Sequence, residues 1–295
     1  MIEQALLEHL QAQSVLATYL SEYDGKPAVF SQEAPADTDL LWRDGSQYGR
    51  IVFAIDLQGD PERVMGGILA VDILCEKDKQ YPEDIEPIIR QMIHGYFFSN
   101  GTFTVVAQWR NSDPFTEPTN RVIGCTVTFE LLAFPILTTV DPDVVARMNE
   151  WMTEIESLHV INYDVMPSNA WRPQNGESAV YCRLVNDNPA GWIPDTYQTI
   201  WRTATMRIHI FSESNAMAGS VARFIVEKLY SDKRLLKTGE SPIMVNRRNG
   251  IDFSADPMRT GQITVEATYG IIVATRKFNP LHHIYTSDER RDHGN

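Results

Sequence analysis

An internal repeat limits what this chain can fold into more than any other feature. The segment Val71-Asp72-Ile73 is matched by Ile208-His209-Ile210 about 137 positions later, and 125–127 is matched by 263–265 at nearly the same spacing. The helix between these strands repeats its apolar positions in order: Ile85, Ile88, Ile89 and Ile93, then Val221, Phe224, Ile225 and Leu229. Shared periodicity alone rarely aligns apolar residues over about fifty-five positions. The sequence therefore predicts two tandem copies of one β-α-β-β domain.

The length of the chain agrees with two domains. A chain of 295 residues divides into two units of common domain size, each able to bury its own core. We place the first copy at 1–137, the second at 138–276 and a C-terminal extension at 277–295. The linker near 135–141 is short, so we expect it to hold the copies in a fixed relative orientation.

Local patterns predict helices and strands in a similar order in both copies. Alternating or continuous apolar runs between Gly, Pro and Asp clusters indicate strands, and apolar residues at helical spacing indicate helices. The expected helices are 2–20, one from Pro82 to about 96, 141–158 and 215–230; the expected strands are 28–31, 48–56, 68–75, 102–109, 122–134, 159–165, 178–185, 199–211, 242–246 and 261–275. We predict an α+β fold in which a mixed or antiparallel sheet is flanked by helices in each copy.

Composition describes an ordinary globular chain, with 43% hydrophobic and 22% charged residues. It has no apolar run long enough to span a bilayer and no basic, apolar leader, so we expect neither secretion nor membrane insertion. The cysteines Cys75, Cys125 and Cys182 stand singly in apolar runs. This placement favours buried thiols in a reducing compartment over disulfides or a zinc site.

The formal net charge is −13, which disfavours binding around the outside of nucleic acid because such binding needs Lys and Arg to displace counterions. An acidic wall could instead enclose DNA and let it slide, because like charges deter adsorption. The other interpretation is that the carboxylates only keep the protein soluble.

The sequence shows no convincing catalytic constellation. It has no glycine-rich phosphate loop, nucleophile elbow, paired CxxC or HExxH. A metal could be held by His282, His283 and His293 with the nearby Asp288, Glu289 and Asp292, but these residues lie in the tail. We therefore predict no metal, cofactor or catalytic residue. His209 alternates with Ile208 and Ile210, so it faces away from them and is either hydrogen-bonded or solvated. We expect that the protein is not an enzyme.

Several polar or inserted segments are candidates for contacts with other proteins. The loops 110–121 and 246–260 occupy equivalent places in the two copies, and 186–197 is an insertion in the second. Trp192 near the tip of this insertion is either a contact residue or packs back on its own sheet. The candidate interface residues are Asp113, Phe115, Glu117, Trp192, Arg247, Arg248, Asp252, Phe253, His282, His283 and Tyr285.

The order of elements resembles that of the tail terminator and tail completion proteins of tailed bacteriophages. The resemblance lies in an amphipathic N-terminal helix, a first strand with a proline (27–31 and 165–167), the strand and helix of 68–96, and a closing hairpin. The runs RVIGCTVTFELLAF (121–134) and GQITVEATYGIIVA (261–274) are similar to the last strands of that family. The likeness covers each copy nearly in full but includes no diagnostic motif.

This resemblance implies a ring that stops tail-tube growth and joins the tail to the head-tail connector. The expected partners are further copies of the chain, the tail tube protein and a connector or stopper protein, with phage DNA passing through the lumen without specific binding. The expected location is the neck or tail of the virion, assembled in the host cytoplasm. Because the domain occurs twice here, the ring could contain six chains or three chains with pseudo-sixfold symmetry. A connector adaptor, stopper or tube-like subunit is the alternative, and an enzyme is the competing class.

Overall fold

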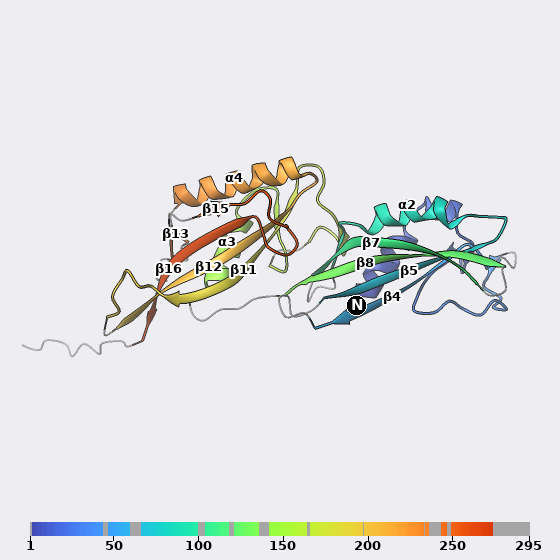
Figure 1. Ribbon diagram of the computed structural model, residues 1–295, viewed down its shortest axis with the longest axis horizontal. Helices are drawn as coiled ribbons and strands as arrows, with labels where there is room; N and C mark the ends of the chain where they lie inside the picture. Colours follow the sequence, from blue (N-terminus) through green and yellow to red (C-terminus); the bar gives the residue numbers. More distant parts are fainter. Residues whose placement is uncertain are drawn as a thin grey trace, which may run out of the picture.

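The computed structural model contains helices and mixed sheets arranged as two halves end to end (Figure 1). It describes residues 2–43, 47–59, 66–99, 104–117, 121–135, 142–163, 166–196, 198–232, 234–235, 243–246 and 249–273. The α+β expectation agrees with this architecture. Helices α2 and α4 lie on the same side of the elongated molecule.

The elements have the following bounds. In the first half they are α1 Ile2–Gln11, a 3₁₀ turn Leu16–Thr18, β1 Glu22–Tyr23, β2 Lys26–Pro27, β3 Val29–Ser31, β4 Arg50–Gln58, β5 Gly66–Glu76, α2 Pro82–Ile93, β6 Phe97–Ser99, β7 Thr104–Thr116 and β8 Val122–Phe134. In the second half they are α3 Val144–Thr153, β9 Leu158–Val160, β10 Ala170–Trp171, β11 Ser178–Pro189, β12 Thr199–Phe211, α4 Asn215–Asp232, β13 Arg234–Leu235, β14 Ile243–Val245, β15 Gly250–Ile251 and β16 Ile263–Ile272.

The two main sheets have matching topology. The first has the order β10-β6-β7-β8-β5-β4-β3 and the second the order β13-β14-β16-β12-β11-β9, with β15 added to β16. In each sheet one short strand at the edge pairs in parallel with its neighbour, β3 with β4 in the first sheet and β9 with β11 in the second. The other pairs are antiparallel. Among the described residues, strand β10 has no counterpart at the edge of the second sheet.

Each half buries its own apolar core between its sheet and its two helices. On α2, Ile85, Ile89 and Ile93 are fully buried at helical spacing, and Pro82 begins the helix where a missing N–H costs nothing. They pack on alternate residues of β5, including Val71 and Ile73. The second core gathers side chains from α3, α4 and the alternate residues of β12 and β16 in the same manner.

Capping explains where α3 begins. The Asp143 carboxylate accepts a hydrogen bond from the Ala146 amide at 3.0 Å, which satisfies one of the free N–H groups of the first turn. The helix therefore begins at Val144 instead of 141. It ends at Thr153. Of the predicted strand 159–165, the structure has a strand at Leu158–Val160 and turns at 161–163, and 164–165 lie outside the described residues.

Three other predictions need correction. The predicted helix 2–20 ends at Gln11 and is followed by a 3₁₀ turn. The predicted polar loop 110–121 is β-strand up to Thr116, because its polar side chains point to solvent while the backbone pairs with β8. Strands β6 and β10 were not predicted.

The alignment of the two halves also changes in detail. Phe224 was predicted to match the core residue Ile88, but it is 51% exposed on α4. The ladders pair Val71 with Val127 and Ile208 with Ile263. If Val71 is placed on Ile208, then Val127, and not Cys125, matches Ile263.

Candidate interaction surfaces

An aromatic cluster joins the two halves. Its members come from both halves, and they lie outside the apolar core of either half. The first half contributes Phe97, Val106, Leu132 and Phe134, and the second contributes Ile161, Trp171, Ala179, Tyr181 and Phe211. All nine are buried. The ring centroids of Phe134 lie 5.0 Å from those of Tyr181 and 5.4 Å from those of Phe211, both edge to face. Such pairs add to the stabilisation that comes from apolar burial.

A strand from the second half completes the sheet of the first. Trp171 of β10 pairs with Phe97 of β6, and Ala170 pairs with Phe98, in an antiparallel ladder. The pairing continues as the Ser99 amide donates to the Asn169 carbonyl at 2.9 Å. An extended segment added to a free sheet edge is a common mode of recognition between proteins, and here it acts within one chain.

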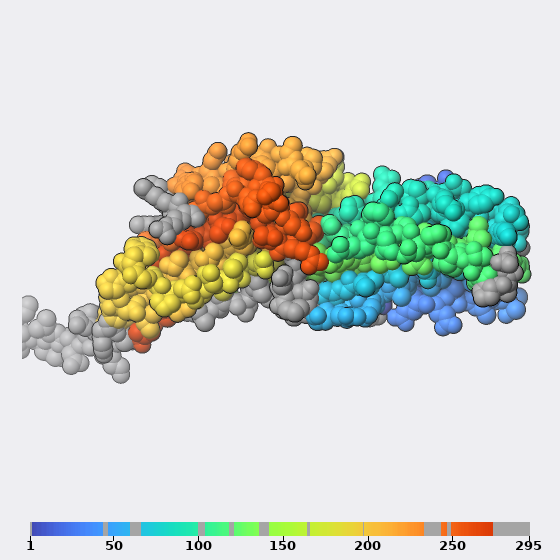
Figure 2. All heavy atoms as spheres, in the orientation of Figure 1, coloured from blue at the N-terminus to red at the C-terminus, as the bar shows by residue number. Residues whose placement is uncertain are grey.

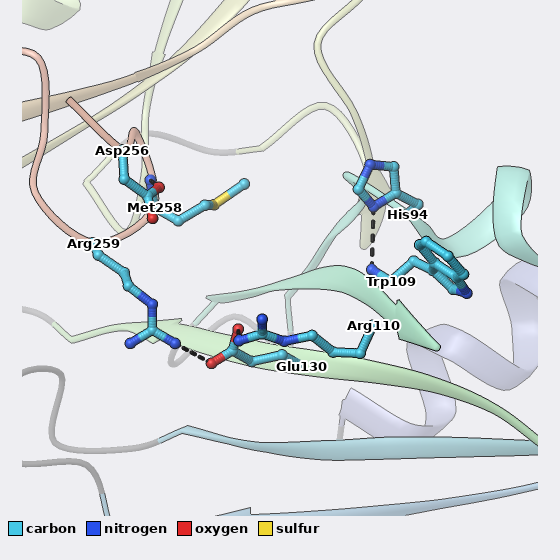
Figure 3. Close-up of polar contacts among 7 residues, drawn as sticks. All are labelled: His94, Trp109, Arg110, Glu130, Asp256, Met258 and Arg259. Carbon is cyan, nitrogen blue, oxygen red and sulfur yellow. Dashed lines mark hydrogen bonds and ion pairs between the residues drawn. The ribbon is translucent and has the colours of Figure 1, made fainter. Parts of the chain in front are cut away.

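Polar contacts fix the same joint. Arg259, in the loop that precedes β16, forms an ion pair with Glu130 of β8, and Arg110 of β7 approaches the same carboxylate (Figure 3). The backbone of this loop is held in turn, since the Arg183 guanidinium donates to the Arg259 carbonyl at 3.0 Å. Figure 2 shows this red-orange loop resting against the green surface of the first half. The hydroxyl of Tyr181 also donates to the Pro135 carbonyl at 3.0 Å.

The candidate residues of the β7–β8 hairpin lie away from this joint. Asp113 is exposed, and Phe115 and Glu117 are half-buried. The ring of Phe115 covers Gly124 on the neighbouring strand so closely that a Cβ at that position would lie 2.3 Å from the ring. Phe115 is thus seated on its own hairpin, while Asp113 remains available to a partner.

Trp192 is 65% exposed at the end of the β11–β12 hairpin. It borders a hollow of about 690 Å³ whose lining includes Thr203, Met244 and Glu266. The indole borders the outer face of its own sheet and still presents most of its surface to solvent, and its role as a contact residue stays a prediction.

The remaining candidates have different outcomes. Asp252 and Phe253 are exposed in the loop after β15, where Arg223 lies over the Phe253 ring at 5.2 Å. Arg247, Arg248, His282, His283 and Tyr285 lie outside the described residues. His209 is fully buried and its Nδ1 lies 2.7 Å from the Pro257 carbonyl oxygen, so it is hydrogen-bonded and not solvated.

The thiols are poorly suited to act as nucleophiles. Burial raises the pKa of Cys75 to about 11, helped by the charges of Glu83 and Asp84, and burial also raises the pKa of Cys182. The three cysteines are free and buried. Within the described residues, His, Cys, Asp and Glu side chains form no group of three or more that could hold a metal ion.

Sequence reasoning missed the residues of the joint, although a signal for one of them exists. The pair Trp171-Arg172 resembles Trp42-Arg43, and each tryptophan precedes a buried branched aliphatic residue of its next long strand by nine positions, Val180 after Trp171 and Ile51 after Trp42. Phe97, Tyr181 and Phe211 look like ordinary core residues in the sequence, because burial between domains and burial within one leave the same apolar pattern.

Comparison with known proteins gives no relative. A scan against protein-family models and a search of curated proteins found no match to this chain. Among the described residues, the helices are too short or too polar to cross a bilayer.

Proposed function

We propose that the two halves are copies of one domain and that the protein is a ring-forming tail terminator of a tailed bacteriophage. The shared strand order supports the duplication, because equal order and equal directions in two mixed sheets are unusual unless the sheets are related. The resemblance to tail terminators rests on the same elements.

The observation that carries the assembly role is the joint between the halves. The first half contributes β6, β7 and β8, whereas the second contributes β10, β11, β12 and Ile161 in the turn after β9, so two like units meet through unlike faces. A contact of this kind is heterologous, and its repetition builds a ring or a helical filament. This geometry suits a protein whose work is to form a ring.

The proposed role also includes the proteins that neighbour the ring and the DNA that passes through it. Its neighbours would be the tail tube protein on one side and a connector or stopper protein on the other, in the neck or tail of the virion. A net charge of −13 suits a channel through which DNA passes without adhering, because phosphates find few cations to bind.

Native mass spectrometry and electron microscopy of the purified chain, alone and mixed with tail tubes, test this function. The expected result is one ring of three or six chains at the end of a tube. Copies stacked along the tube would favour the tube-like alternative. Compact monomers at high concentration, with or without tubes, would contradict the proposal.

A further inference from the structure

Among the residues that the structure describes, the joint within the chain leaves each half with one face that lies outside the contact between the halves. The first half uses its β6–β8 side and the second its β9–β12 side. The faces that remain are the β3–β5 side of the first half and the β13–β16 side of the second.

The strand ladders show which residues correspond. In the first half Val106 pairs with Leu132 and Phe98 with Val105; in the second Met244 pairs with Thr268 and Leu235 with Ile243. Placing Val71 on Ile208 and following the ladders outward gives these matches: Leu132 with Thr268, Val106 with Met244, Phe98 with Leu235 and Glu130 with Glu266.

The free face of the second half is hollowed where the first half is filled. Met244 and Glu266 line the hollow of about 690 Å³ beside Trp192. Strand β13 is the outermost strand of its sheet, in the place of β6, and among the described residues no strand covers its outer edge as β10 covers β6. By the same correspondence, Glu266 occupies the position of Glu130, the residue that forms an ion pair with Arg259 across the joint within the chain.

The remaining face of the first half carries the matching segment, in which Trp42 is itself buried against Tyr23 and Phe30. The structural match of Ile51 to Val180 places Trp42 on Trp171 and Leu41 on Ala170. Leu40 is 96% exposed and Leu41 is 50% exposed, which is unusual for adjacent large apolar residues with no function. Behind them, Phe30, Val52 and Leu74 are half-buried apolar residues, and their counterparts in the second half are Ile161, Tyr181 and Phe211 of the joint.

From this correspondence we propose that successive chains join head to tail, with residues 40–42 of one chain added to the outer edge of β13 of the next. The occupant of each free face is a second copy of this chain, and the contact repeats between chains the joint that exists within one. This inference rests on the proposed ring-forming function and supplies its interface.

Substitutions on the two faces test the contact separately. The double variant L40D/L41D removes the apolar segment, and M244D places a charge in the hollow beside Glu266. The control F224D alters a side chain of similar exposure on α4, outside both faces. Light scattering and native mass spectrometry should show association weakened roughly tenfold or more by L40D/L41D and by M244D, and unchanged by F224D.

Mixing the two defective proteins gives a sharper result. Each retains one intact face, so an equimolar mixture should yield a complex of two chains and stop there. In a separate variant, L41C/L235C, oxidation should crosslink neighbouring chains, because Leu41 and Leu235 correspond to the paired Ala170 and Phe98. The matched control L41C/I272C should give no crosslink.

The outcomes distinguish this inference from the proposed function. Rings that form equally well from L40D/L41D and M244D would overturn the interface and leave the ring function standing. Open filaments that depend on both faces would support the interface and count against the ring. A chain that stays monomeric at the highest attainable concentration and with tail tubes, and forms no L41C/L235C crosslink, would overturn both.

Discussion

Phe97 of the first half and Phe211 of the second meet edge to face with their ring centroids 5.2 Å apart. Phe97 is 2% exposed and Phe211 is 6% exposed, so the contact excludes water as a domain core does. The two sheets therefore share one apolar cluster and are held as a single body by more than their linker.

Replacement of Phe97 by alanine should destabilise the whole chain. Loss of a buried aromatic side chain leaves a cavity and costs about 3 kcal/mol of unfolding free energy or more. Denaturant unfolding followed by circular dichroism measures this loss, and Phe211→Ala should behave alike. Phe224→Ala, which removes a half-exposed ring, should change stability by only about 0.5 kcal/mol. Equal effects for Phe97 and Phe224 would show that the joint contributes little.

Acidification should weaken the fold through His9. Burial lowers the pKa of His9 below 6.5; a hydrogen bond to the Met92 carbonyl opposes this shift, and the Arg172 charge assists it. Because the unfolded chain then binds the proton more readily, this contribution to stability is complete above pH 6.5 and is lost as the pH falls below it. His94, whose pKa is lowered by burial and by Arg90, acts in the same direction.

Measuring the unfolding free energy from pH 7.5 to pH 5 checks this. The variant H9Q should show a flatter pH dependence than the wild type, and H94Q should remove a separate part of the slope. An NMR titration that gave His9 a pKa above 6.5 would refute the prediction.

Alanine at Gly124 should displace Phe115 from its hairpin. The new Cβ would lie 2.3 Å from the Phe115 ring and 2.7 Å from the Ile73 carbonyl oxygen. Overpacking of this kind costs about 1–3 kcal/mol. Thermal unfolding of G124A should show the loss, whereas G191A, where nothing lies within 4 Å of the new Cβ, should unfold like the wild type.

The three thiols should resist modification until the chain unfolds. Cys75, Cys125 and Cys182 are 0%, 7% and 2% exposed, and burial raises the pKa of each thiol. A thiol-reactive dye should label none of them in buffer at pH 8 and all three in denaturant. Rapid labelling of Cys182 in buffer would show that the second core opens readily.

The sequence predicts regular elements well where one periodicity governs many residues. Strand 199–211 is found with the predicted bounds, and the helix predicted at 215–230 extends only two residues further. It predicts poorly where pairing is short or lies between the halves. Strands β6 and β10 have three and two residues, and no pattern forms over so few positions.

The candidate site was predicted less well than the fold. The longer β11–β12 hairpin changes the spacing between the halves, so an alignment at one fixed offset passes over the match of Trp42 to Trp171. Leu40 and Leu41 look like the start of a buried segment in the sequence, and only their exposure in the structure marks them as a surface.

The pairing of β10 with β6 has a consequence for synthesis of the chain. The first sheet receives its last strand only after residue 171 has left the ribosome, although every other strand of that sheet is made by residue 134. Until then the edge of β6 and the aromatic rings beside it face solvent, a state that promotes nonproductive pairing between nascent chains. A stop codon placed between the halves should therefore yield an insoluble fragment, and chaperone demand should peak at mid-translation.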